Sequence, residues 1–432
     1  MISHLDPKDK FLQDRQAVLV TYPDPFCVNE AKELVESAEY IILSTVTHRY
    51  LSKAKYGISE GKAEKLRDII EEVGANIVIF DEKLRSTQIY NLAKLTGCEI
   101  IDRERMILEI FSKRATTTEA KLQIELAELV YEKPRAKEKV RLARISEQPG
   151  FFGLGKYEID VYDQHLKRRI SKIKMKLRDT RKMRELHRIH RERLQMPIIS
   201  LAGYTGAGKT TLFNKLTGDK KEVGKKPFTT LTTSTRLVNL NGFKILLSDT
   251  VGFISKLPNY MIEAFKSTLE ELIYTNQLLL ILDVSQSIED ISRHYNSCVD
   301  VLIDLGVSPE KVFLVFNKSD MQDEAHLKSK LLFSGLTPQN SVFISAKTGL
   351  GINVLLEKIK KNTFKSARAN VLIKKHEIIS LSSLIDWLKS QGKVEIKKQN
   401  NGDLMLNLMT KSWVLERFTK SVKEIRKKED VI

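Results

Sequence analysis

The sequence predicts an α/β protein: a phosphate-loop domain, an N-terminal α/β unit that continues into a helical hairpin, and a small C-terminal α+β domain. Three observations predict it. A Gly-rich loop separates an apolar run from a helical segment at 197–216. Apolar runs alternate with helical stretches over the first hundred residues, and a strand–helix–strand–strand order follows near the C-terminus. The expected domain boundaries are 1–115, 116–195, 196–365 and 366–432.

The N-terminal unit is predicted to contain a small parallel sheet. Its apolar runs, short enough for buried strands, lie at 18–20, 41–43 and 77–80. Stretches with helical spacing at 30–38 and 62–73 separate them. Such an alternation favours parallel strands joined by crossover helices.

Two segments with helical periodicity predict a long hairpin at 116–195. Apolar residues of the second segment step by four, three and four, as in a coiled-coil seam: Leu166, Ile170, Ile173 and Leu177. The first segment has a seam of its own: Ala120, Ile124, Ala127 and Tyr131. Between them, PGFFGLG at 149–155 contains proline and glycines that break helices, so we expect a turn with an aromatic tip.

Positive charge is concentrated on the second hairpin segment. The chain has a formal net charge of +17, and residues 165–195 contain 13 Lys and Arg against three acidic residues. Such an excess gains little internal salt bridging, whereas phosphate contacts would release counterions, so RNA is the expected partner. The alternative is a solvated helical face, and the aromatic tip could stack on a base or pack the turn. The candidate RNA-contacting residues are Phe151, Phe152, Lys167, Arg168, Arg169, Lys172, Arg181 and Arg188.

The segment GYTGAGKT at 203–210 matches the phosphate-loop pattern G-x-x-x-x-G-K-[ST]. Its glycines let backbone N–H groups and the N-terminus of the following helix point at phosphate oxygens. Lys209 would supply charge to the β- and γ-phosphates, and the Thr210 hydroxyl would bind Mg²⁺. The nucleotide-binding residues expected here are Gly203, Tyr204, Thr205, Gly206, Ala207, Gly208, Lys209, Thr210 and Thr211.

Two later segments point to guanine as the base. NKSD at 317–320 follows a strand-like run, and its Asp320 carboxylate can accept from N1–H and the 2-amino group of guanine, which adenine lacks. SAK at 345–347 follows another such run and offers a backbone N–H to guanine O6. GTP is therefore the expected nucleotide. The nucleotide-binding residues expected here are Asn317, Lys318, Asp320, Ser345, Ala346 and Lys347.

A magnesium site is predicted from DTVG at 249–252 and the threonine-rich run at 229–235. Asp249 would hold the metal, usually through water, and the Gly252 N–H would meet the γ-phosphate. One threonine of the run would complete the coordination, with Thr230 favoured and Thr229 a competitor. The predicted metal ligands are Thr210, Thr230 and Asp249.

The expected reaction is in-line attack of water on the γ-phosphoryl group, which positioning and charge stabilisation accelerate. The predicted catalytic set is Lys209, Thr230 and Gly252. Phe253 occupies the place where many switch GTPases have a glutamine that orients water. We therefore expect slow intrinsic hydrolysis that a partner accelerates. Arg236 is a candidate for an arginine finger within the chain, although an exposed strand arginine is the simpler interpretation.

The block 249–271, DTVGFISKLPNYMIEAFKSTLEE, closely resembles the signature of the HflX family of translation-associated GTPases. The resemblance spans about residues 56–360 and includes further similar segments at 56–64, 84–92, 101–111 and 121–129. It is weaker at Thr232 and Thr233, where the family commonly has Asp-Pro, and at 153–158, where the family is richer in glycine. The resemblance implies a P-loop GTPase that docks on the large ribosomal subunit, probes its rRNA with the hairpin, and splits or rescues stalled ribosomes.

The C-terminal domain is predicted to have a strand at 371–373 and a helix at 380–390. A hairpin turned on Asn-Gly joins 394–399 to 403–409. The last helix, 412–428, carries Lys and Arg and could extend a basic surface.

The protein is expected to be a monomer in the cytoplasm. Three widely separated cysteines, Cys27, Cys98 and Cys298, suggest a reducing compartment. The first residues contain no secretory h-region and no apolar run approaches a membrane span. Two other functions stay open: a regulatory GTPase that switches a protein complex through the hairpin, and an ATP-driven RNA remodelling enzyme. Asn317 and Asp320 disfavour the second of these.

Overall fold

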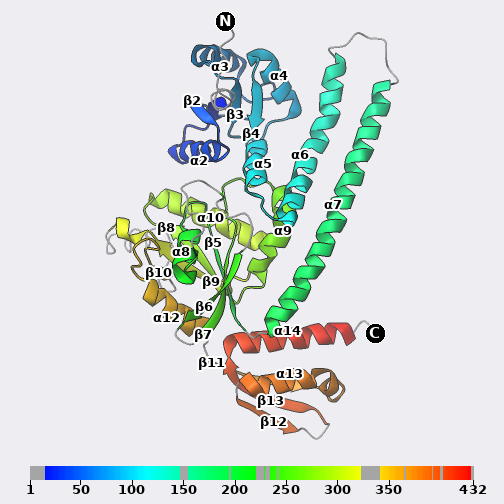
Figure 1. Ribbon diagram of the computed structural model, residues 1–432, viewed down its shortest axis with the longest axis vertical. Coiled ribbons are helices and arrows are strands. Elements are labelled where there is room, and N and C mark those ends of the chain that lie inside the picture. The colour runs from blue at the N-terminus through cyan, green and yellow to red at the C-terminus, as the bar shows by residue number, and fades with distance from the viewer. Residues whose placement is uncertain are drawn as a thin grey trace.

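The computed structural model describes residues 15–145, 154–193, 196–219, 228, 234–240, 243–322, 341–363, 366–391, 393–398 and 402–429. Within them, three β-sheets and a helical hairpin form an elongated molecule, with the N-terminal sheet at one end and the C-terminal sheet at the other (Figure 1). The predicted α/β class is confirmed. None of the helices in these ranges is both long and apolar enough to cross a membrane.

The N-terminal sheet is parallel, in the order β2-β1-β3-β4. Its strands are β1 (Gln16–Thr21), β2 (Ile41–Thr47), β3 (Ile77–Phe80) and β4 (Glu99–Asp102). Its helices are α2 (Pro25–Ser37), α3 (Glu60–Val73), α4 (Ser86–Thr96) and α5 (Arg103–Arg114). The parallel sheet was predicted, but β4 was missed. Its run, EIID, is too short to show a periodicity and flows directly into α5.

The hairpin consists of α6 (Thr118–Ile145) and α7 (Leu154–Arg193). The predicted seam of α7 packs on α6, where Leu166 and Ile173 are buried against Leu126 and Leu129. The predicted seam of α6 is also buried, but it belongs to a core shared with α5 and the following domain: Ala120, Ile124, Ala127 and Tyr131. Helix α6 is therefore apolar on two faces, because it lies between α7 and the body of the protein. Most of the expected aromatic tip falls outside the described residues.

The central sheet has the strand order β10-β9-β8-β5-β7-β6 and is parallel except for β6. Its strands are β5 (Ile198–Gly203), β6 (Ser234–Leu240), β7 (Phe243–Asp249), β8 (Gln277–Asp283), β9 (Val312–Asn317) and β10 (Ser341–Phe343). Its helical segments are α8 (Lys209–Thr217), α9 (Asn259–Ile273), α10 (Ile288–Asp304), η1 (Pro309–Lys311), η2 (Ser319–Met321) and α12 (Ile352–Thr363). The predicted site segments that begin at residues 203, 249, 317 and 345 lie at or just beyond the carboxyl ends of parallel strands, where α/β sheets bind ligands.

The C-terminal sheet is antiparallel, in the order β11-β13-β12. Its elements are β11 (Ser366–Ile373), η4 (Lys375–Glu377), α13 (Ile378–Gln391), β12 (Lys393–Lys398), β13 (Leu404–Lys411) and α14 (Ser412–Glu429). The strand–helix–strand–strand order and the final helix were predicted, but β11 is longer than its predicted segment. Phe418 of α14 and Leu406 of β13 are fully buried in the core between helices and sheet.

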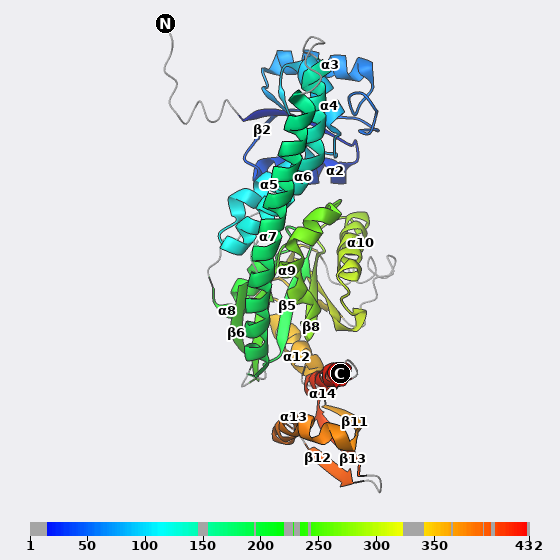
Figure 2. The same cartoon turned by 90° about the vertical axis from the view of Figure 1, so that its right-hand side faces the viewer.

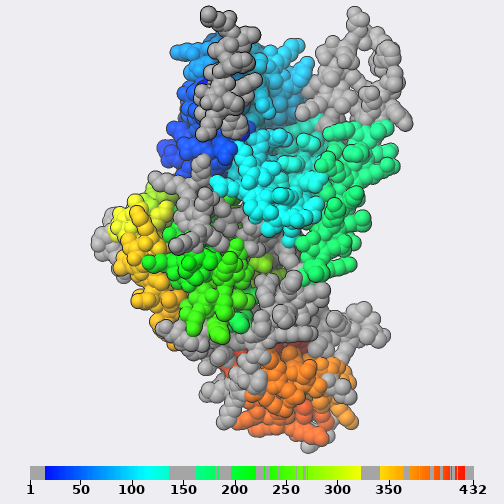
Figure 3. Space-filling view, viewed as in Figure 1, coloured from blue at the N-terminus to red at the C-terminus, as the bar shows by residue number. Residues whose placement is uncertain are grey.

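The N-terminal sheet unit rests directly on the central domain, and the hairpin stands beside both (Figures 1 and 2). One hydrophobic cluster contains residues of both parts. At its centre, the Phe111 ring of α5 meets Phe228 and Phe265 edge-on, with centroid distances of 4.6 and 4.9 Å. Helix α7 forms one outer edge of the molecule in the space-filling view (Figure 3). The central domain is thus packed against the N-terminal unit rather than tethered to it.

Candidate nucleotide-binding site

Two glycines give the phosphate loop its shape. A Cβ atom on Gly203 would lie 2.4 Å from the Ile281 carbonyl oxygen of β8, and the residue has φ +148°. A Cβ atom on Gly208 would lie 2.2 Å from Nδ2 of Asn317, and its φ is +92°. Neither position has room for a side chain. The chain can therefore turn sharply from β5 into α8, whose first residue is Lys209.

Lys209 is buried and curls back over the loop. Its Nζ donates to the carbonyl oxygens of Gly203, at 3.0 Å, and Tyr204, at 2.7 Å. Burial lowers the pKa of Lys209 to about 8, against the opposing attraction of Asp249. A bound phosphate would restore the favourable environment for its charge, because an opposite charge stabilises a buried cation. This is the arrangement expected of a phosphate-binding lysine.

Thr210 and Asp249 meet at the foot of the loop. The Thr210 hydroxyl donates to Oδ2 of Asp249 at 3.2 Å, and both side chains are buried. A hydroxyl and a carboxylate oxygen side by side form a hard donor set that fits Mg²⁺, which takes few protein ligands and keeps waters and phosphate oxygens. Thr229 and Thr230 lie outside the described residues, so the choice between them stays a prediction.

Asn317 joins the two loops that were predicted to hold the phosphates and the base. Its Nδ2 donates to the Ala207 carbonyl oxygen at 2.8 Å, and its Oδ1 accepts from the Ala346 N–H at 2.9 Å. The side chain is only 2% exposed. The two loops are therefore held in register by one buried amide. The Ala346 N–H, one of the backbone donors expected near guanine O6, is bound to Asn317 in this structure.

The remaining base-site residues are also adjacent. The Ser319 N–H donates to the Ile344 carbonyl oxygen at 3.0 Å, which brings the NKSD and SAK segments together. Lys318 forms an ion pair with Asp283 at 2.5 Å. Asp320 and Lys347 are exposed, whereas Ser345 and Ala346 are buried. The structure thus brings the predicted nucleotide residues to one edge of the central sheet, with the Asp320 carboxylate open to solvent.

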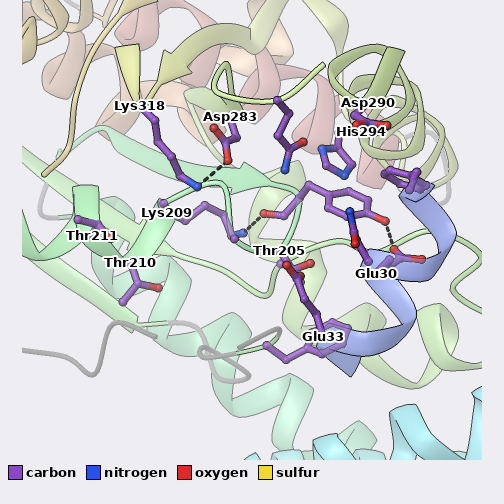
Figure 4. Close-up of a pocket in the computed structure, with 18 of the residues that line it drawn as sticks. Glu30, Glu33, Thr205, Lys209, Thr210, Thr211, Asp283, Asp290, His294 and Lys318 are labelled. Carbon is purple, nitrogen blue, oxygen red and sulfur yellow. Dashed lines mark hydrogen bonds and ion pairs between the residues drawn. The ribbon is translucent and has the colours of Figure 1, made fainter. Parts of the chain in front are cut away.

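A cavity of about 710 Å³ opens beside the phosphate loop. The predicted residues that line it are Tyr204, Thr205, Gly206, Gly208, Lys209, Thr210, Thr211, Gly252 and Lys318. Its opposite wall comes from elements that the sequence analysis did not connect with the site, α2 and α10, as Figure 4 shows for Glu30, Glu33 and His294. In the sequence the α2 carboxylates resemble a solvated helix face, so no local signal marks them. Only the packing of the N-terminal unit brings them here.

The loop after Asp249 is fastened to the phosphate loop; we call residues 250–258 the switch loop. The Thr205 N–H donates to the Phe253 carbonyl oxygen at 2.8 Å, and the Phe253 N–H donates to the Gly203 carbonyl oxygen at 3.1 Å. The Phe253 ring is 2% exposed and belongs to the core shared with the N-terminal unit. A Cβ atom on Gly252 would lie 2.9 Å from Nζ of Lys209. Phe253 is therefore an anchor, and its ring cannot orient a water molecule.

Tyr204 connects the phosphate loop to the N-terminal unit. Its hydroxyl donates to the Glu30 carboxylate, the contact drawn as a dashed line in Figure 4. Its ring stacks on His294 of α10 at a centroid distance of 3.7 Å. Burial lowers the pKa of His294 to about 4, so the stacked imidazole is neutral at pH 7. The sequence pattern treats Tyr204 as a variable loop position and does not predict this role.

The candidate RNA-contacting residues fall into three groups. Arg168 and Lys172 are exposed on α7. Lys167 is paired with Asp163 at 2.8 Å and Arg169 with Glu125 of α6 at 2.7 Å. The side chains of Arg181 and Arg188 on α7, and the whole of Phe151 and Phe152, lie outside what the structure describes. Arg236, considered as an arginine finger, instead forms an ion pair on β6 with Asp219 at 2.9 Å.

Three family models match the chain. The one described as GTP-binding GTPase N-terminal matches residues 27–112, GTP-binding GTPase Middle Region matches 114–191, and 50S ribosome-binding GTPase matches 198–318. The relative named GTPase HflX from Thermofilum pendens is 38% identical over 92% of this chain and 97% of its own. GTPase HflX from Escherichia coli is 34% identical over 81% and 83%, respectively. A solved GTP-binding protein of Sulfolobus solfataricus in complex with GDP is 28% identical, covers 81% of this chain and 98% of its own, and has a TM-score of 0.45.

Proposed function

Because the chain belongs to the HflX family of GTPases, and so binds and hydrolyses GTP, we propose that it is a GTP-controlled switch that docks on the large ribosomal subunit. The docking would use rRNA contacts of the hairpin, and the outcome would be the splitting or rescue of stalled ribosomes. The protein would act in the cytoplasm as a monomer. The observation that carries the ribosomal part is the basic face of α7, together with the match of the central domain to a family described as 50S ribosome-binding GTPase.

In the proposed site, backbone N–H groups of the phosphate loop and Lys209 bind the phosphates, and Asp320 selects guanine. Thr210 and Asp249 would hold Mg²⁺ with Thr230, and the metal would neutralise charge that develops on the phosphate oxygens. The Gly252 N–H would bind the γ-phosphate, so its position reports the nucleotide state. With the Phe253 ring in the core, hydrolysis by the protein alone should be slow and should accelerate on the ribosome. Rapid single-turnover hydrolysis without a partner would contradict this.

The RNA contact would be made by one side of the hairpin. Besides the ion-paired Lys167 and Arg169, five cationic side chains of α7 are exposed between Leu166 and Leu177 or just beyond: Arg168, Lys172, Lys174, Lys176 and Arg178. Three of them recur every fourth residue and so follow one side of the helix. The partly exposed positions of α6 include the acidic residues Glu125, Glu128 and Glu132, so the opposite helix offers phosphates less attraction. A row of cations along a helix can contact several phosphates of a nucleic-acid backbone at once, whereas a single anion would need only one of them.

Co-sedimentation with purified ribosomal subunits tests the proposal. The protein is incubated with large or small subunits in the presence of a non-hydrolysable GTP analogue, GDP or no nucleotide. Selective pelleting with large subunits in the GTP-like state is expected. A lack of pelleting in every state at low salt would refute the ribosomal function and favour a protein complex as the target.

A charge-reversal pair of variants tests the RNA contact. The triple variant Arg168→Glu, Lys172→Glu and Lys176→Glu should weaken binding, and should lower the slope of log K against log salt by roughly 0.7–0.9 for each phosphate that the variant no longer binds. The matched control reverses three exposed lysines on α3 and α4: Lys62→Glu, Lys65→Glu and Lys94→Glu. Equal weakening in both variants would show a general charge effect and would contradict a specific role for α7.

A further inference from the structure

We infer that three consecutive residues at the start of α5, Asp102, Arg103 and Glu104, form a relay that couples the hairpin to the switch loop and the phosphate loop. This inference rests on the proposed function, since it says how the nucleotide state would reach the RNA-binding helix pair. The three residues lie within 101–111, one of the segments that resemble the HflX family. No residue of this segment is among those that line the cavity beside the phosphate loop. Their side chains connect the start of α5 to α2 and the switch loop, to α6, and to α9.

The first branch is Arg103, which reaches the nucleotide site. Its guanidinium donates to Glu30 of α2 at 2.7 Å, to Asp81, and to the backbone oxygen and hydroxyl of Ser255 at 3.0 and 3.2 Å. Glu30 in turn accepts hydrogen bonds from the Tyr204 hydroxyl and from the N–H and hydroxyl of Ser255. The side chain of Arg103 is 5% exposed. One buried guanidinium thus ties α2, the switch loop and the phosphate loop into one cluster.

The second branch is Asp102, which reaches the hairpin. Its carboxylate accepts from the Tyr131 hydroxyl at 2.9 Å and from the Arg135 guanidinium at 2.7 Å, both on α6. It also caps α5 by accepting from the Arg105 N–H at 2.9 Å. Burial and the adjacent carboxylate raise the pKa of Tyr131, so its hydroxyl stays protonated and donates. The register of α6 is therefore fixed to the first turn of α5.

The third branch is Glu104, which reaches the helix that follows the switch loop. Its carboxylate accepts from the Tyr260 hydroxyl of α9 at 3.2 Å and pairs with Lys83 at 2.9 Å. Further along α5, the Phe111 ring packs edge-on against Phe228 and Phe265. Helix α5 consequently contacts the switch loop, the helix after it and the residue just before the threonine-rich run.

These contacts couple the hairpin to the switch loop, because neither can move without breaking buried hydrogen bonds or ion pairs. A Cβ atom on Gly252 would lie 2.9 Å from Nζ of Lys209, so Gly252 lies beside the lysine expected to bind the phosphates. In the proposed relay, a γ-phosphate bound by the Gly252 N–H shifts the switch loop, which carries Ser255 three residues later. Moving Ser255 disturbs the partners of Arg103 and Glu30, and a buried charge that loses a partner is strongly disfavoured. Because Asp102 and Arg103 are consecutive residues at the first turn of α5, a shift of Arg103 also shifts the Asp102 carboxylate relative to its partners on α6. The coupling must be reciprocal, so a change at the hairpin end must alter the preference between GTP and GDP.

A double-mutant cycle on the full chain tests the relay. Tyr131→Phe removes the hydroxyl at the hairpin end, and Ser255→Ala removes the hydroxyl at the switch-loop end. The measured quantity is the ratio of affinities for a non-hydrolysable GTP analogue and GDP. Each single variant is expected to change this ratio by about fivefold or more, and the double variant should change it by less than the product of the two single changes.

The matched control is Tyr40→Phe. The Tyr40 hydroxyl also donates to a carboxylate of α5, Glu109, at 2.6 Å. Glu109 pairs with Arg105, which lies 4.0 Å from Glu132 of α6, so this route to the hairpin bypasses the side chains of Asp102 and Arg103. Tyr40→Phe should leave the affinity ratio unchanged. The relay is refuted if Tyr131→Phe has no more effect than Tyr40→Phe, or if the two hydroxyl deletions act independently.

Subunit pelleting separates this inference from the proposed function. If the effects of Tyr131→Phe and Ser255→Ala on the affinity ratio are non-additive but the wild-type protein does not pellet with subunits, the relay is supported and the ribosomal function is refuted. If the wild-type protein pellets with large subunits in the GTP-like state but the two variants act independently on the affinity ratio, the relay alone is refuted. If the two variants are non-additive, and GTP-dependent pelleting of the wild-type protein is weakened by Tyr131→Phe, both the relay and the ribosomal function are supported.

Discussion

Replacing Asn317 with alanine would test whether one buried amide holds the phosphate loop and the base loop in register. The side chain makes hydrogen bonds of 2.8 Å to the Ala207 carbonyl and 2.9 Å from the Ala346 N–H, and it is 2% exposed. Its removal takes a partner from two buried backbone groups, and each such loss costs about 1–3 kcal/mol. We expect a local destabilisation of about 2–6 kcal/mol. If half of it, about 1–3 kcal/mol, opposes nucleotide binding, the GDP dissociation constant rises by about 5- to 150-fold.

Hydrogen exchange and GDP titration measure the two consequences separately. Peptides that cover residues 341–351 should exchange faster in Asn317→Ala, because the Ala346 N–H loses its acceptor. Glu357→Ala, on the exposed side of α12, is the control and should change neither quantity. A GDP affinity within twofold of wild type, with unchanged exchange at Ala346, would refute the idea that this side chain sets the spacing of the two loops.

Three shorter predictions concern the same domain. Phe253→Gln should not accelerate hydrolysis, because position 253 points into the core; it should instead lower stability by about 2–4 kcal/mol, and a faster single turnover would contradict this. Gly203→Ala should abolish GDP binding measured by equilibrium titration, because its Cβ would lie 2.4 Å from the Ile281 carbonyl oxygen, and retained affinity would show that the loop can relax. The pKa of His294 is about 4 when folded and 6.5 in its ordinary state. The unfolded chain therefore binds more protons between these values, and stability falls by up to about 3 kcal/mol as pH drops from 6.5 to 4. The unfolding temperature should change less with pH over this range in His294→Gln than in wild type. An equal slope in the two proteins would contradict the lowered pKa of His294.

The elements that the sequence predicted best are those with strong local signals. The phosphate loop was found because glycines at 203 and 208 satisfy steric needs that any residue with a Cβ would violate. The parallel N-terminal sheet and the α7 seam were found because apolar spacing follows the period of each element. The short strand β4 was missed because four residues cannot show a period. The seam of α6 was identified correctly, whereas its packing partners, α5 and the central domain, were established only by the structure.

The candidate site divides in the same way. The P-loop, NKSD, SAK and DTVG segments were predicted from residue type and order, because each acts through its own backbone and side chains on one small ligand. Glu30, Arg103 and His294 were not connected with the site, because their place beside it depends on how the N-terminal unit packs. Nothing in the local sequence of α2 distinguishes a carboxylate that faces the phosphate loop from one that faces solvent.

The sequence by itself determined the family, the nucleotide and the basic helix, because these depend on motif chemistry and on charge that can be counted along the chain. Only the tertiary structure decided that Phe253 is a core anchor and that Tyr204 binds the N-terminal unit. It also decided that residues 102–104 stand between the hairpin and the switch loop. Those properties arise where segments distant in sequence share one buried interface, in which the cost of leaving a charge or hydrogen-bonding group without a partner fixes which residues must meet.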